Sequence, residues 1–291
     1  MLGYEDIYDN YLNNFKIYLD KYFLRNDGNI PREIFEPMKY AVADGGKRIR
    51  PVLCLAVADM LGISRDKVLN YCLAIEFIHS YSLVHDDLPC MDNDDYRRGK
   101  LSTHKKYGEA MGVLIGDALL NTAFELCLNK NDSNQNDIKA MRIITNCAGA
   151  SGMIAGQVGD MAFNNQEGTE NDLLNIYINK TSKLIMCSVL VPSILANNKY
   201  YYELKEFAMN LGILFQITDD ILDEESSLSV LGKTPHKDKE ENKLTSIKIF
   251  GLDGAKAQAE EYYERCLYIL ECVNNSEFLS EFTTKLYNRK K

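Results

Sequence analysis

The strongest constraint on the fold of this chain is a helical period of apolar residues that runs almost from end to end. Four stretches carry apolar residues on every side of a helical wheel: 67–85, 111–128, 141–156 and 207–222. A helix with that pattern is expected to be central and buried. No stretch alternates apolar and polar residues for long enough to predict a sheet. The sequence therefore predicts a single all-α domain over residues 1–291.

Polar segments separate the predicted helices. They span 129–137, 163–170, 196–203 and 224–243, and none is rich enough in Pro or Gly to divide two domains. Gly45 and Gly46 are expected to end an earlier helix. Pro51 fits the first position of the next helix, because its missing amide needs no partner there.

The bulk composition is that of an ordinary soluble protein, with 46% hydrophobic and 26% charged residues. The net charge of -9 argues against nucleic acid as a partner. The N-terminus is acidic and polar, unlike a signal peptide, and we expect no membrane span. The eight cysteines include no CxxC pair. These features predict a cytoplasmic protein with reduced cysteines.

Aspartates crowd into the stretch HDDLPCMDNDDYRRGK, where they are Asp86, Asp87, Asp92, Asp94 and Asp95. Two carboxylates about 4 Å apart repel by roughly 4 kcal/mol at an effective dielectric near 20. A fold that holds them together usually supplies a cation, and all-oxygen ligands suit Mg²⁺. The sequence therefore favours a magnesium site here.

Asp86 and Asp92 share an ion only if the helix breaks between them. Pro89 supplies that break, because it lacks an amide proton and disfavours helix at Leu88. A calcium EF-hand loop is the competing interpretation of this stretch. It fails because Tyr96 occupies a ligand position and the turn glycine is misplaced.

A second acidic cluster, Asp219-Asp220-Ile221-Leu222-Asp223, lies far along the chain. On a helix Asp219 and Asp223 share a face, and Gln216 lies one turn earlier. Carboxylates on an otherwise apolar helix are hard to explain as a solvated surface, although a surface or capping role is the alternative.

Basic residues accompany both clusters. The loop Gly45–Pro51 feeds a helix N-terminus and is a natural anion site, and Arg97 and Arg98 form an arginine pair suited to phosphate. His79 lies two helical turns before Asp86, where a ligand role competes with that of an ordinary core histidine. Further lysines at 180, 233 and 243 are either ligands or solvated side chains.

Carboxylates, arginines and lysines in this combination are suited to a metal-bound diphosphate. The sequence has neither a Walker lysine loop nor a GxGxxG motif, so nucleotide transfer is disfavoured. The residues between the clusters are Leu, Ile, Phe, Met and Tyr, which indicates an apolar tail on the diphosphate.

Several segments together carry a family resemblance: GGKRIRP, HDDLPCMD, NDDYRRGK, GDALL, GQVGDM, KTSKL and FQITDDILD. In this order they resemble the isoprenyl diphosphate synthases of the trans type, over nearly the whole chain. The closest resemblance is to the bacterial farnesyl diphosphate synthases, whose first motif carries the same insertion, here Pro89-Cys90. The resemblance implies the isoprenoid synthase fold, which is a single-domain bundle of long helices around a deep central cavity, and usually a homodimer.

The resemblance also implies a role for each matching residue. Three Mg²⁺ ions would be held by the metal ligands Asp86, Asp92, Asp219 and Asp223. The allylic diphosphate would be contacted by Arg97, Lys180 and Lys243, with Lys233 nearby. Isopentenyl diphosphate would be bound by Gly46, Lys47, Arg50, His79 and Arg98. The developing carbocation would face the oxygens of Thr181 and Gln216 and the backbone carbonyl of Lys180.

The expected reaction is condensation of isopentenyl diphosphate with dimethylallyl or geranyl diphosphate to give farnesyl diphosphate. Tyr81 and Ser82, just over one helical turn before Asp86, are the expected chain-length residues. The alternatives are a geranylgeranyl diphosphate synthase, a terpene cyclase, or a non-catalytic subunit of a heteromeric prenyltransferase. Two segments depart from the family pattern, namely 224–230 and Thr245-Ser246-Ile247.

Overall fold

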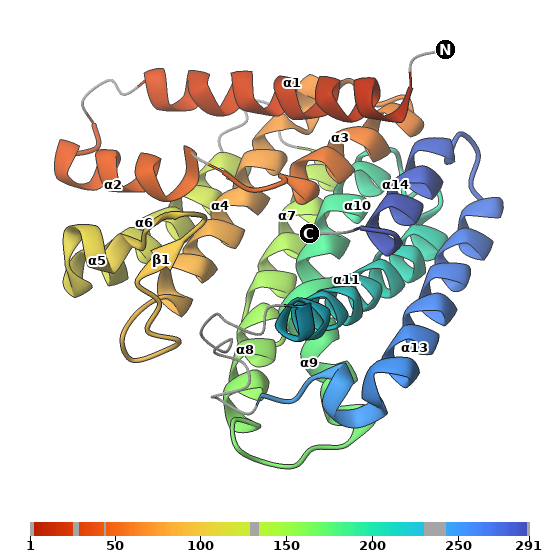
Figure 1. Ribbon diagram of the computed structural model, residues 1–291. Helices are drawn as coiled ribbons and strands as arrows, with labels where there is room; N and C mark the ends of the chain where they lie inside the picture. The colour runs from red at the N-terminus through yellow and green to blue at the C-terminus, as the bar shows by residue number, and fades with distance from the viewer. Residues whose placement is uncertain (1–2, 26–28, 44, 129–133, 230–242, 290–291) are drawn as a thin grey trace. The chain divides into compact units, whose positions relative to one another are not determined.

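A computed structural model of the protein describes residues 3–25, 29–43, 45–128, 134–229 and 243–289. By their contacts, the residues divide into two units, Met1–Met141 (unit 1) and Arg142–Lys291 (unit 2). The described elements are almost all helices, as Figure 1 shows, so the predicted all-α class is confirmed. The single domain stays a prediction, and the units are taken in turn.

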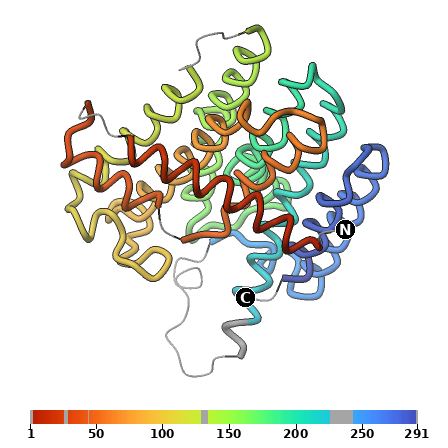
Figure 2. Tube along the Cα trace, turned by 90° about the horizontal axis from the view of Figure 1, so that it is seen from above, coloured from red at the N-terminus to blue at the C-terminus, as the bar shows by residue number. Residues whose placement is uncertain are grey.

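Unit 1 contains the N-terminal helices and a short hairpin. Its elements are α1 Tyr4–Leu24, α2 Arg32–Ala43, α3 Ile49–Met60, η1 Arg65–Lys67, α4 Leu69–Asp86, β1 Tyr96–Arg97, β2 Lys100–Leu101, α5 Thr103–Tyr107 and α6 Glu109–Leu128. Helix α1 packs against α3 and α4, and can be followed as the dark red tube in Figure 2. The antiparallel pair β1–β2 is the exception to the prediction of no sheet.

Helix α4 forms the core of unit 1. It packs between α3 and α6, and most of its residues are buried, as its all-round apolar pattern predicts. Helix α6 approaches it closely at Gly116, where a Cβ atom would lie 1.9 Å from Nε2 of His85. The prediction that α6 is itself buried on all sides is wrong, because Val113 and Leu114 are 43% and 55% exposed. An apolar wheel indicates a buried helix only when every face meets a neighbour.

Unit 2 contains the longest helices. Its elements are α8 Met153–Ala162, α9 Glu170–Tyr177, the π-helical turn η2 Ile178–Ser182, α10 Lys183–Leu195, α11 Tyr201–Ser229, α13 Ser246–Glu271 and α14 Glu277–Tyr287. Helix α7, Gln135–Ala148, crosses the division between the units. Within unit 2, α11 packs against α10 and α13.

Two predicted boundaries in this half of the chain are wrong. The stretch 141–156 is not one helix, because the chain turns between α7 and α8. At Gly152 a Cβ atom would lie 2.1 Å from the carbonyl oxygen of Cys147, so only glycine allows this turn. Helix α11 also continues through Ser229, and so includes the first residues of the polar connector predicted to begin at 224.

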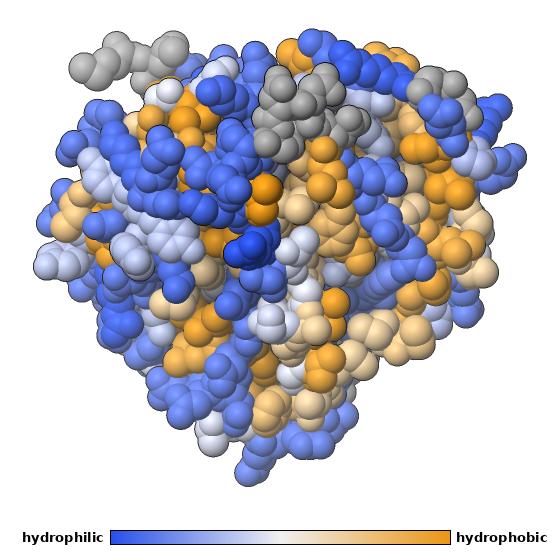
Figure 3. Space-filling model, turned by 180° about the vertical axis from the view of Figure 1, so that it is seen from behind, coloured by the Kyte–Doolittle hydropathy of each residue, from blue (hydrophilic) through white to orange (hydrophobic). Residues whose placement is uncertain are grey.

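Two helical segments are long and apolar enough to cross a membrane, Glu109–Leu128 and Glu170–Leu195. Core helices of soluble proteins meet the same criterion, and 72% of the apolar window in the second segment is buried. Exposed apolar side chains are interspersed with polar ones on the face shown in Figure 3. The expectation of no membrane span therefore stays a prediction. Six of the eight cysteines are buried and all eight are free thiols.

Candidate active site

The first acidic cluster lies where α4 ends in unit 1. The chain turns at Leu88 and Pro89, and the Asp92 amide then donates to the Asp86 carbonyl at 2.8 Å. The Asp94 amide likewise donates to the Asp87 carbonyl at 3.1 Å. This confirms the prediction that Asp92 returns to the end of the helix beside Asp86.

Arg97 neutralises part of this cluster. Its guanidinium donates twice to Asp87, with Nε at 2.9 Å from Oδ1, and lies 3.3 Å from Asp94. Burial raises the pKa of Asp87, and the bonds to Arg97 oppose that shift. Arg97 thus braces the turn, and its contact with an allylic diphosphate stays a prediction.

The β1–β2 hairpin brings Arg98 to the glycine loop. Its two turn residues, Arg98 and Gly99, have φ values of 53° and 77°, as a tight type I′ turn requires. The Arg98 side chain lies over the loop backbone, where a Cβ atom on Gly46 would meet its Cζ atom at 2.8 Å. Its Nη1 donates to the Gly45 carbonyl at 3.4 Å. Gly46 is therefore needed for the close approach of Arg98 to this loop, and the binding of isopentenyl diphosphate by these residues stays a prediction.

Arg48 organises the same loop, although the sequence did not single it out. It has a left-handed φ of 50° and pairs with Glu76 of α4 at 2.5 Å, and the side chains of both are 2% exposed. It also donates to the Val42 carbonyl. Helix α3 begins at Ile49, so Pro51 is its third residue and not its first. Proline is tolerated there because first-turn amides have no acceptor within the helix.

His79 lies among the arginines of this loop and hairpin. Loss of solvation lowers its pKa well below the ordinary value, and the charges of Arg50, Arg98, Arg48 and Arg97 add to that effect. His79 is therefore neutral at pH 7 and able to donate one hydrogen bond. The positive charges of Arg50 and Arg98 thus act on His79, and the binding of isopentenyl diphosphate by these three residues stays a prediction.

Both predicted chain-length residues lie on α4. Tyr81 is 6% exposed, and its ring meets that of His85 edge to face at 5.8 Å. The Ser82 hydroxyl donates to the His79 carbonyl at 2.9 Å. The packing places Tyr81 inside unit 1, and its role in chain length stays a prediction.

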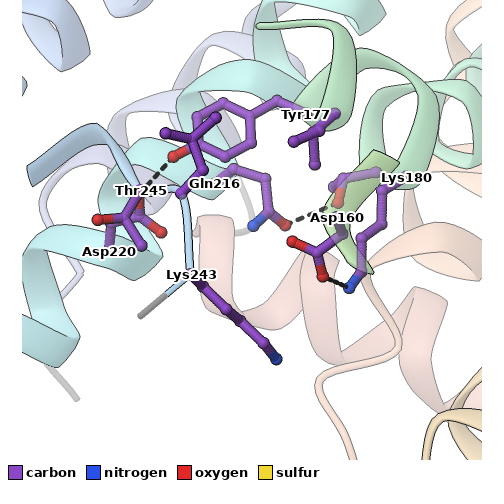
Figure 4. A pocket seen from close by; sticks show the side chains of 10 residues that line it. Asp160, Tyr177, Lys180, Gln216, Asp220, Lys243 and Thr245 are labelled. Atoms are coloured by element: carbon purple, nitrogen blue, oxygen red, sulfur yellow. Dashed lines mark hydrogen bonds and ion pairs between the residues drawn. The ribbon is translucent and has the colours of Figure 1, made fainter. Parts of the chain in front are cut away.

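Unit 2 contains a cavity of about 140 Å³. Figure 4 shows its lining, which comes from α8, α9, η2, α11 and the segment before α13. The lining residues are Asp160, Ile176, Tyr177, Lys180, Thr181, Gln216, Asp220, Lys243, Leu244 and Thr245. Four residues predicted from separate parts of the sequence, at 180, 181, 216 and 243, thus surround one space.

Thr181 and Gln216 are bonded to each other across this cavity. The Thr181 hydroxyl donates to Oε1 of Gln216 at 2.7 Å, so both side chains present oxygens to the same place. Thr181 lies in the π-helical turn η2, a conformation often found at functional sites. Gly212 lets this turn pack against α11, because a Cβ atom there would lie 2.2 Å from the Ser182 hydroxyl.

Lys180 is held by Asp160 of α8, a residue that the sequence did not single out. Its Nζ lies 2.5 Å from the Asp160 carboxylate. Gly156 makes this contact possible, because a Cβ atom there would lie 2.1 Å from the Lys180 amide nitrogen. Asp160 follows Gly156 by one helical turn and lies on the same face. The spacing in GQVGD was the available signal.

Asp220 is bonded within unit 2 through its Oδ2 atom. The Tyr177 hydroxyl donates to that oxygen, and so do the amide of Ser246 at 2.7 Å and its hydroxyl at 2.9 Å. Loss of solvation raises the pKa of Asp220 to about 6, against the opposing effect of these hydrogen bonds. The second aspartate of the motif therefore holds two other elements in place.

Asp219 pairs with Arg289, near the C-terminus, at 2.5 Å. The Arg289 guanidinium also donates to the Phe215 carbonyl and to the Thr218 hydroxyl, each at 2.8 Å, and lies 4.4 Å from the centroid of the Phe215 ring. Asp223 follows Asp219 by one turn of α11, as predicted. Lys233 lies outside the described residues, as does the end of the unusual segment 224–230.

The donor chemistry fits Mg²⁺. Asp86 and Asp92 in unit 1, and Asp219 and Asp223 in unit 2, offer the carboxylate oxygens that this ion prefers. Within the described ranges no three His, Cys, Asp or Glu side chains gather into a complete metal centre. The assignment of these four carboxylates to Mg²⁺ stays a prediction.

The sequence model of the polyprenyl synthetase family matches residues 31–274. The chain belongs to this family. It is similar to a farnesyl diphosphate synthase of Micrococcus luteus, with 41% identity over 77% of each chain. It is equally similar to a chloroplastic geranylgeranyl pyrophosphate synthase of Catharanthus roseus, with 42% identity over 79% of this chain and 66% of the relative.

Solved structures agree with this assignment. A geranyltransferase from Legionella pneumophila matches with a TM-score of 0.86 and 29% identity, and the match covers 98% of this chain and 97% of the geranyltransferase chain. A geranyltransferase from Helicobacter pylori, complexed with magnesium and isoprenyl diphosphate, has a TM-score of 0.83 and 31% identity. That match covers 99% of this chain and 97% of the other. The chain is therefore a short-chain trans-prenyltransferase with the isoprenoid synthase fold.

Proposed function

We propose that the protein is a farnesyl diphosphate synthase, which joins isopentenyl diphosphate to dimethylallyl and then to geranyl diphosphate. The observation that carries the product length is Tyr81, a buried aromatic residue on α4. It precedes Asp86 by five residues, so it lies just over one turn, or roughly 7.5 Å, before the end of the helix. That distance is comparable to one or two isoprenoid units.

The charges of both units suit the chemistry of this reaction. Breaking the allylic C–O bond places negative charge on the leaving pyrophosphate, and Mg²⁺ held by Asp86, Asp92, Asp219 and Asp223 would stabilise that charge. Lys180, Lys243 and Arg97 would bind the same group, and Lys233 is assigned with them. No protein nucleophile is needed, because the isopentenyl double bond attacks the allylic cation and a proton is then lost.

The remaining assignments separate the second substrate from the cation. Isopentenyl diphosphate would be bound by Gly46, Lys47, Arg50, His79 and Arg98. The oxygens of Thr181 and Gln216 would face the allylic cation, and the hydrogen bond between them keeps both oriented. A preorganised dipole at that position lowers the barrier without a cost of reorganisation during the reaction.

Product analysis tests the proposed function. Wild type, Tyr81→Phe and Tyr81→Ala would each be given isopentenyl and dimethylallyl diphosphates with Mg²⁺, and the products separated by chain length. Wild type and Tyr81→Phe should release C15, because both keep the ring. Tyr81→Ala should release mainly C20 and longer products, since the opened space buries additional tail at about 0.8 kcal/mol per CH₂.

Three outcomes would change the assignment. If Tyr81→Ala releases the wild-type product, Tyr81 is not the chain-length residue. If the wild type itself releases C20, the geranylgeranyl alternative replaces the farnesyl one, and the plant relatives make this the second candidate. If the purified chain forms no product alone, the result favours the alternative of a subunit of a heteromeric prenyltransferase. Two Arabidopsis relatives are named as large subunits of heterodimeric enzymes.

The homodimer and the cytoplasmic location belong to the same proposal. Both rest on the family resemblance and on the composition of the chain. Sedimentation of the purified protein tests the first, and fractionation of cells that produce it tests the second.

A further inference from the structure

We propose that Asp220, Tyr177 and Ser246 (the Asp220 cluster) position Lys243 for the leaving pyrophosphate. This deepens the proposed function and rests on it. Asp220 belongs to an acidic motif that suggests metal binding, yet three donors from two other elements meet on its Oδ2 atom. The bonds join α9, α11 and the first residue of α13.

The bonds to Asp220 determine where α13 begins. Ser246 is its first residue and is completely buried. Amides of the first turn have no acceptor within their helix, and the positive end of the helix dipole favours an anion there. Asp220 supplies both an acceptor and a negative charge. The Thr245 side chain caps the same helix by accepting from the Lys248 amide at 3.2 Å.

Leu244, the residue between Lys243 and Thr245, is held by packing. It is 3% exposed, and a Cβ atom on Gly168 would lie 2.5 Å from its Cδ2 atom. The backbone around Lys243 is thus defined by a packed Leu244 and a bonded Ser246, which follow Lys243 by one and three residues.

Lys243 lines the same cavity as Lys180. Figure 4 shows its side chain extended, with the ammonium group away from the Asp220 carboxylate. Lysine is a flexible point charge, so the position of its backbone decides where the charge is available. The hydrogen-bonded Asp220 cluster therefore positions Lys243, and Asp220 acts on the diphosphate through Lys243.

A plain helix cap is the competing explanation, and it makes a different prediction. A cap contributes only to stability, whereas a positioning role also alters pyrophosphate affinity, and only while Lys243 is present. The variants Ser246→Ala and Tyr177→Phe each remove one hydroxyl from the cluster. Ser188→Ala and Tyr263→Phe are matched controls, because each removes a bonded hydroxyl elsewhere in unit 2.

The experiment is a double-mutant cycle on the full chain. Each variant is made in the wild-type and the Lys243→Ala backgrounds, and binding of inorganic pyrophosphate with Mg²⁺ is measured by calorimetry beside thermal unfolding. We expect Ser246→Ala to weaken pyrophosphate binding about tenfold in the wild type, and less than about twofold without Lys243, as coupled residues require. Both controls should leave the affinity unchanged.

Two results would overturn the proposal. One is a lower unfolding temperature with unchanged affinity, which identifies a plain cap. The other is an equal loss of affinity in both backgrounds, which excludes action through Lys243. If Ser246→Ala does not fold, Tyr177→Phe provides the same cycle. If the cycle shows the expected coupling but the wild-type protein forms no prenyl product, the proposed function is refuted. The role of the Asp220 cluster in pyrophosphate binding still stands.

Discussion

The buried pair between Arg48 and Glu76 offers a direct test of what holds the glycine loop in place. Both side chains are 2% exposed and the charged atoms are 2.5 Å apart. The variant Glu76→Gln keeps the shape of the side chain and removes its charge, which leaves the Arg48 guanidinium buried without its counter-ion. We expect a large loss of stability, since a buried charge that loses its partner is costly.

The magnitude follows from the depth of the pair. Breaking a buried pair by removing one partner typically costs about 3–5 kcal/mol. The Arg48 bond to the Val42 carbonyl remains in Glu76→Gln, so the lower end, about 3 kcal/mol, is the expected loss. The control is the exposed pair between Arg265 and Glu261, whose side chains are 52% and 48% exposed. Glu261→Gln should cost at most about 1 kcal/mol.

Urea unfolding at neutral pH measures both losses. A second effect is expected on catalysis, because Arg48 lies in the sequence between Lys47 and Arg50, which are proposed to bind isopentenyl diphosphate. Glu76→Gln should therefore raise KM for isopentenyl diphosphate more than KM for the allylic substrate. A loss below about 1 kcal/mol, equal to that of the control, would show that the pair does not support the loop.

Three further predictions follow from the site. Exhaustive chelation should abolish turnover, and Asp86→Ala or Asp219→Ala should lower kcat at least about a hundredfold, or about 2.7 kcal/mol, with circular dichroism unchanged; full activity without metal would contradict the magnesium assignment. Arg50→Ala should raise KM for isopentenyl diphosphate far more than for the allylic partner, and steady-state kinetics that show equal rises would refute separate sites. Because the pKa of His79 lies below its unfolded value near 6.5, the unfolded chain takes up the proton first, so the free energy of unfolding should fall as pH drops below about 6.5. His79→Gln should flatten that dependence in urea titrations, and an unchanged pH profile would show that His79 does not cause it.

Local features of this protein could be predicted because their causes are local. Pro89 must end α4, and the return of Asp92 to Asp86 follows from that break. The helical spacing of Asp219 and Asp223 is likewise contained in five consecutive residues. Helix existence and most helix positions follow from apolar periodicity in the same way.

Long-range partners could not be predicted from the same patterns. Glu76 and Arg289 each pair with a residue more than twenty positions away, and nothing near them in the sequence indicates that partner. The break at Gly149–Gly152 was missed for a different reason. Glycine and alanine do not interrupt an apolar run, and the close contact that requires Gly152 appears only in three dimensions.

The pairing of Arg289 with Asp219 has a practical consequence for handling this protein. A tag fused directly after Lys291 begins three residues beyond Arg289, whose side chain holds a proposed metal ligand. A polyhistidine tag at that position adds competing metal ligands. A preparation whose tag has been cleaved off avoids these added ligands, and metal titrations on it report on the protein's own carboxylates.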